Sequence, residues 1–162
     1  MAKNVEAGLQ AQRLADVVSI RDLKARYFRY MDTRDWDGMR DVFTADAVMD
    51  MRADIATQEK FGLPVDPDAG LIVGRDTIVS SMREPLEGVV TVHHGHMPEI
   101  DLVSDDKATG IWAMEDLIIL PEGGPARRLH GYGHYHEDYV REEDGRWRIA
   151  RLRLSRLFVE FD

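Results

Sequence analysis

The first part of the chain carries apolar residues at three- and four-residue steps, the spacing of one face of an α-helix. Over residues 5–31 this face consists of Leu14, Val17, Ile20, Leu23, Tyr27 and Met31. A shorter helix is predicted over 36–43, with Asp35 as its N-cap. A third helix is predicted over 75–86, where Pro85 and Gly88 mark the end of the pattern.

From Val89 onward the apolar positions alternate with polar ones, which is the period of a β-strand. Strands are expected at 47–51, 89–94, 97–103, 108–120, 127–141 and 146–158. Helices followed by a strand meander are typical of an α+β fold, with helices packed on one face of a curved antiparallel sheet. A chain of 162 residues is expected to form a single domain over 1–162.

The segment 52–74 is the least regular part of the chain. It contains Gly62, Pro64, Pro67 and Gly70 among acidic residues. A loop of this length is uncommon inside a compact domain and is often functional. It is expected to be either a lid at the entrance of a site or an insertion without a role.

Composition excludes several classes of protein. The chain has no cysteine, which rules out disulfides, zinc–thiolate sites and thiol nucleophiles. A formal net charge of −9 argues against nucleic-acid binding. Neither a membrane-spanning segment nor a signal peptide is recognised, so a cytoplasmic location is expected.

All six histidines lie between positions 93 and 136, and in the strand from Leu129 three of them alternate with other residues. One face of this strand carries the rings of His130, Tyr132, His134 and His136. These rings either line a concave polar pocket or face water. We favour the pocket.

Asp116 shares an apolar strand face with Trp112, where a carboxylate is costly unless it is paired or functional. Arg156 shares a face with Leu154 and Phe158, and is a natural partner for a buried or bound anion. A cupin-type metal site built from His134 and His136 with Glu142 is a weaker alternative, since the neighbouring residues supply no clear third ligand and the helices come first. No metal is therefore expected.

Three stretches resemble the SnoaL-like branch of the NTF2-like superfamily: RYFRYMDTRDWDGMRDVF, HHGHMPEIDLVSDDKATGIWAMED and GYGHYHEDYVREEDGRWRI. Within this branch the chain resembles bile-acid 7α-dehydratases, and more distantly scytalone dehydratase, hexachlorocyclohexane dehydrochlorinase and the diarylpropane lyases. The resemblance implies a cone-shaped fold in which helices close a strongly curved antiparallel sheet around a cavity.

The resemblance also implies the site. An Asp–His dyad falls on Asp32 and His93, the active-site tyrosine on Tyr27, the second aspartate on Asp116 and an arginine on Arg156. Residues expected to contact the substrate are His96, Tyr132, His134, Arg156 and Trp112. A further tyrosine of the family's first strand falls near Met51, which cannot donate a proton, so the donor could be another residue such as His134.

The implied activity is that of a lyase without a cofactor, which eliminates water from a hydroxylated aromatic or polycyclic small molecule. Release of formaldehyde from a lignin-derived diol needs nearly the same residues and stays open. A non-enzymatic binding or assembly module, or a proton shuttle like that of ketosteroid isomerase, are further alternatives. Related lyases are commonly trimers, so a homotrimer is expected.

Overall fold

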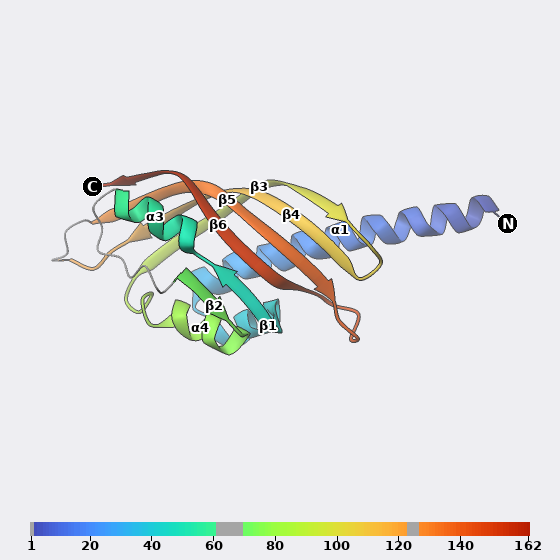
Figure 1. Ribbon diagram of the computed structural model, residues 1–162, viewed down its shortest axis with the longest axis horizontal. Coiled ribbons are helices and arrows are strands. Elements are labelled where there is room, and N and C mark those ends of the chain that lie inside the picture. The colour runs from blue at the N-terminus through green and yellow to red at the C-terminus, as the bar shows by residue number, and fades with distance from the viewer. Residues whose placement is uncertain (1, 61–69, 123–126) are drawn as a thin grey trace.

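The computed structural model describes residues 2–60, 70–122 and 127–162, and has helices on one face of a six-stranded sheet (Figure 1). The elements in chain order are α1 (Ala2–Thr33), α2 (Trp36–Val42), β1 (Phe43–Asp50), α3 (Arg52–Lys60), β2 (Leu71–Val73), α4 (Arg75–Arg83), β3 (Val90–Leu102), β4 (Lys107–Ile119), β5 (Arg128–Arg141) and β6 (Trp147–Phe161). This arrangement confirms the predicted α+β class.

The sheet has the strand order β2-β1-β6-β5-β4-β3. The strands from β3 to β6 form a meander of antiparallel pairs, and short turns at 103–106 and 142–146 join β3 to β4 and β5 to β6. β1 pairs with β6 in parallel and with β2 antiparallel. The sheet is therefore antiparallel except at one ladder, which joins the helical half of the chain to the meander.

The segment expected as a long loop begins with a helix instead. α3 follows β1 after Met51, and β2 extends the sheet beyond β1. Residues 61–69, which belong to the segment predicted to be a lid or an insertion, lie outside the described part of the chain. Asp50 accepts hydrogen bonds from the Arg52 backbone and side chain, which helps start the helix at this point.

Irregular pairing changes two other predictions. The strands expected at 89–94 and 97–103 form one strand, β3, with a shift of register between Gly95 and Pro98. In the β5–β6 pair, a shift of register between Tyr132 and Gly133 places Phe158 on the outer face against Tyr132. Phe158 therefore does not share the inner face with Arg156. Both irregularities bend the sheet, as extra residues in a strand commonly do.

The C-terminal half of α1 packs across the concave face of the sheet, and its N-terminal half projects beyond the sheet edge (Figure 1). Of the predicted apolar face, Ile20, Leu23, Tyr27 and Met31 are buried, but Leu14 is 66% exposed. Leu14 lies on the projecting part, where no strand is available to cover it. Among the described residues, no helix combines the length and the apolar character needed to cross a membrane.

Candidate active site

A cavity of about 410 Å³ lies between the concave face of the sheet and helices α1, α3 and α4. Its walls are mostly apolar and include four methionines, Met31, Met49, Met51 and Met82. Methionine side chains adapt to irregular shapes, which suits the binding of a bulky apolar molecule. Polar groups reach the cavity from two sides, His93 from β3 on one side and Asp54, Asp116 and Arg156 on the other.

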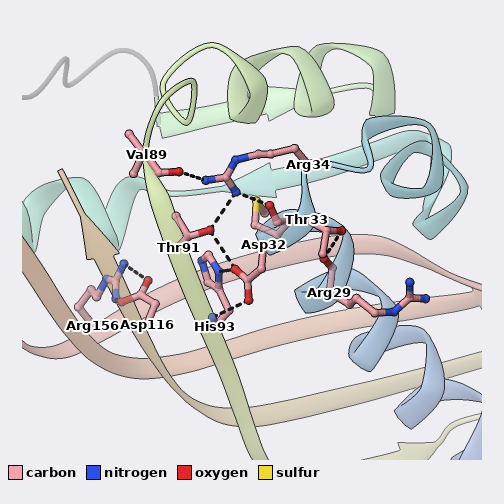
Figure 2. Close-up of polar contacts among 10 residues, drawn as sticks. Arg29, Asp32, Thr33, Arg34, Val89, Thr91, His93, Asp116 and Arg156 are labelled. Atoms are coloured by element: carbon pink, nitrogen blue, oxygen red, sulfur yellow. Dashed lines mark hydrogen bonds and ion pairs between the residues drawn. The ribbon is translucent and has the colours of Figure 1, made fainter. Parts of the chain in front are cut away.

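On one side, Asp32 at the end of α1 meets His93 on β3 (Figure 2). The distance from the His93 Nδ1 atom to Asp32 Oδ1 is 2.6 Å, and the His93 backbone N–H donates to Asp32 Oδ2 at 2.9 Å. The His93 side chain is buried, whereas Asp32 is partly open. Because Nδ1 faces a carboxylate, it carries the proton and Nε2 is left as the basic atom.

Further hydrogen bonds hold the Asp32 carboxylate in place. The Thr91 hydroxyl donates to Asp32 Oδ1 at 2.9 Å, and Arg34 donates to Thr91 Oγ1 at 2.9 Å (Figure 2). Arg34 adopts a left-handed backbone (φ 62°) and also donates to the carbonyl oxygens of Met31 and Val89. Burial alone would raise the pKa of Asp32, but the hydrogen bonds from His93 and Thr91 lower it overall.

Two phenols form the inner end of the cavity. Tyr27 from α1 and Tyr135 from β5 are both buried, with ring centroids 5.9 Å apart in an edge-to-face arrangement. Burial raises the pKa of Tyr27 far above its usual value, and the nearby Glu137 carboxylate adds to the shift. Burial likewise raises the pKa of Tyr135. Both hydroxyls therefore stay protonated at neutral pH and can donate.

On the other side, Arg156 of β6 is clamped between two carboxylates. Its Nη1 and Nη2 atoms donate to the two oxygens of Asp116 at 2.6 and 2.8 Å, and its Nε donates to Asp54 of α3 at 2.6 Å. All three side chains are at most 5% exposed. The pKa of Arg156 rises further above its usual value, because these carboxylates outweigh the effect of burial. Arg156 is thus already paired within the protein.

Behind the phenols lies a second buried ion pair. The Lys24 Nζ atom is 2.5 Å from Glu137 Oε1, and both side chains are fully buried. The ammonium lies over the ring of Tyr135 at 3.6 Å and over that of Tyr27 at 3.9 Å from the centroids. Burial lowers the pKa of Lys24 to about 8 against the opposing effect of Glu137. The aromatic rings separate this pair from the cavity.

The rings of His130, Tyr132, His134 and His136 on β5, here called the ring ladder, do not line the cavity, so the prediction that they form a concave pocket is wrong. Odd-numbered residues of β5 such as Tyr135 are buried, while His130, Tyr132, His134 and His136 are only partly buried on the outer face. The glycines explain the choice of face. A Cβ at Gly133 would lie 2.1 Å from the Ser155 carbonyl oxygen, so this inward position next to β6 has no room for a side chain.

The two remaining predicted contacts also lie outside the cavity. Trp112 is buried on the inner face, where its indole N–H donates to the Tyr139 hydroxyl at 2.8 Å. His96 lines a separate groove between α1 and the irregular part of β3. Tyr27, Asp32, His93, Asp116 and Arg156 are thus brought together, but Trp112, His96, Tyr132 and His134 are not.

Sequence reasoning missed Tyr135 and Asp54, which both reach the cavity. Alternation along β5 contained the signal for Tyr135, since it lies on the face opposite the ring ladder. Within residues 2–60, 70–122 and 127–162, no three histidine or carboxylate side chains gather as a metal site, and the cupin-type set is not assembled.

The model of the SnoaL-like domain family matches residues 12–153. Type 2 hexachlorocyclohexane dehydrochlorinase (LinA) superposes with a TM-score of 0.77 at 21% identity, covering 94% of this chain and 93% of its own. The LinA-type3 enzyme of Novosphingobium barchaimii gives 0.75 at 19%, covering 94% of each chain.

A protein of Novosphingobium aromaticivorans, provisionally assigned as a scytalone dehydratase, gives a TM-score of 0.75 at 20% identity, covering 93% of this chain and 90% of its own. At these identities the likeness shows the fold, and it confirms the expected NTF2-like architecture. The structural neighbours include lyases.

Proposed function

The chain belongs to the SnoaL-like family, and on this premise we propose that it is a lyase without a cofactor, which eliminates water from a hydroxylated aromatic or polycyclic molecule. The observation that carries the proposal is the Asp32–His93 pair at the wall of a mostly apolar cavity. A binding module would not need a histidine held in one tautomer by a supported carboxylate.

In the proposed reaction His93 is the general base. The Asp32 carboxylate fixes Nδ1–H and stabilises the imidazolium that forms when Nε2 takes a proton from substrate carbon. The dyad is preorganised, because Thr91 and the His93 backbone N–H already hold the carboxylate. Imidazole suits this task, since its ordinary pKa lies near neutral pH.

Tyr27 is the proposed general acid for the departing hydroxyl. Its phenol lines the cavity and stays protonated, and Tyr135 is close enough to support it. Asp116 is less suited to this role than the sequence indicated, because both of its oxygens accept hydrogen bonds from Arg156. Asp116 and Arg156 instead shape the polar side of the cavity.

The first prediction tests the dyad. His93→Ala and Asp32→Asn should each lower turnover roughly 10²- to 10⁴-fold, since each removes part of one base. The double variant should be no slower than the slower single variant. Turnover is measured with phenolic diols and hydroxysteroid thioesters, by following new conjugation in the ultraviolet and by assaying formaldehyde.

His94→Ala is the matched control, because His94 is the neighbouring histidine and its side chain is 60% exposed. It should retain full turnover. Activity close to wild type in either dyad variant would remove the dyad from the mechanism. Stoichiometric formaldehyde would replace elimination of water by carbon–carbon cleavage, and no turnover of any substrate in these classes would favour a binding module.

A further inference from the structure

The cavity holds more fixed negative than positive charge. Arg156 is the only lysine or arginine that reaches it among the described residues. The undescribed segments 61–69 and 123–126 contain no lysine, arginine or histidine in their sequence. Any anion entering the cavity would therefore depend on Arg156 or on the His93 ring for a positively charged partner.

The positive charge of Arg156 is already balanced by neighbouring carboxylates. It forms two hydrogen bonds with Asp116 and one with Asp54, all between buried side chains. One guanidinium and two carboxylates leave the group with a charge of about −1. The imidazolium form of His93 is in turn matched by Asp32 at 2.6 Å.

Lys24 does not change this balance. Its ammonium is paired with Glu137, is fully buried, and lies behind the rings of Tyr27 and Tyr135. A carboxylate, sulfate or phosphate inside the cavity would thus meet a net negative field from the buried carboxylates. Burying an unpaired charge under these conditions is strongly unfavourable.

We propose that the cavity selects an uncharged molecule. Asp54 sets this selection because it accepts the hydrogen bond from Arg156 Nε–H that would otherwise be available to a substrate anion. The inference rests on the proposed function, which supplies the assumption that a substrate enters the cavity. It adds that the part of the substrate that enters is neutral. Charged groups can be present only on a portion that remains outside.

The test compares neutral and anionic ligands of the same shape. The probes are methyl 6-hydroxy-2-naphthoate and 6-hydroxy-2-naphthoate, together with methyl 4-hydroxybenzoate and 4-hydroxybenzoate, measured by titration calorimetry at pH 7.5. Each ester should bind roughly 10- to 100-fold more tightly than its acid, because a like charge is brought beside the buried carboxylates. Equal affinities, or failure of both esters to bind at millimolar concentration, would overturn the proposal.

Asp54→Asn should reduce the preference for the ester about tenfold or more, since one carboxylate on Arg156 is removed. Glu59→Gln is the matched control, because it removes the same charge from an exposed position on α3. It should keep the wild-type preference. An unchanged preference in a folded Asp54→Asn protein would show that Asp54 does not set the selection.

A second measurement in the wild-type protein needs no variant. An acid forced into this cavity should take up a proton, so its binding enthalpy should depend on the ionisation enthalpy of the buffer, while that of the ester should not. Binding of the acid without proton uptake would contradict the proposal. Repeating the comparison in His93→Ala separates the two hypotheses, because charge selection should persist in a protein without lyase activity.

Discussion

The ion pair between Arg156 and Asp116 requires a glycine at position 131. A Cβ built at Gly131 would lie 2.0 Å from Arg156 Nη1 and 2.4 Å from Asp116 Oδ1. Gly131→Ala should therefore displace the pair and lower the free energy of unfolding by about 1–3 kcal/mol, measured by urea denaturation. Gly8→Ala is the control, because nothing lies within 4 Å of its Cβ and the helix gains from alanine. Equal stability of the two variants would contradict this account.

The resemblance to the SnoaL-like family indicated five residues that the structure brings together around the cavity, whereas spacing along the chain alone could not pair Asp32 with His93. Tyr27 and Asp32 both lie in the last two turns of α1, and His93 and Asp116 are directly opposite each other on β3 and β4. Alternation alone could not show which face of β5 is inside, so Tyr132 was chosen where Tyr135 belongs. The deciding factor is the close approach of β6 to the inward glycines, which is a tertiary contact.

Among the elements, α3 was missed because its nine residues precede a run of prolines and glycines that favours a loop. It is tied to the sheet by the contact of Asp54 with Arg156, about one hundred positions away in the chain. The helix periodicity of α1 and the alternation of β4 to β6 are local, and they predicted these elements well. Strand ends and irregular pairing depend on neighbours and were predicted less well.

The outer face of the sheet carries the ring ladder of β5, and the exposed Phe158 stacks on Tyr132. We propose that this surface packs against other copies in a homotrimer. Light scattering at micromolar concentration should give about three times 18.5 kDa. Tyr132→Glu should shift the protein toward monomers, because the new charge would be buried, whereas Ala56→Glu on the exposed side of α3 should not. A wild-type monomer would refute the proposal.

For the molecule as a whole, buried ionisable groups predict an unusual dependence of stability on pH. Lys24 has its pKa lowered to about 8, so between pH 8 and 10.5 the unfolded chain binds more protons and stability rises with pH. Tyr27, Tyr135 and Tyr139 have raised pKa values, mainly through burial, so above pH 10 the unfolded chain loses protons first and stability falls.

Stability should therefore pass through a maximum near pH 10, with each phenol contributing up to about 1.4 kcal/mol per pH unit beyond it. Urea denaturation at half-unit steps from pH 7 to 11.5 measures the curve. Lys24→Met should abolish the rise, and Tyr27→Phe should make the fall less steep. Constant stability between pH 10 and 11.5 would show that the phenols ionise freely in the folded protein.

The clamp of Arg156 between Asp54 and Asp116 has an evolutionary consequence. Aspartate and asparagine codons differ at their first base, so a single transition in the gene converts Asp54 to asparagine. The dyad is carried by α1 and β3 and would be inherited unchanged. Under the proposed charge selection, descendants that arise by gene duplication would diverge in the charge of the molecules they accept while keeping the proposed reaction, and this divergence would be traceable at a single codon.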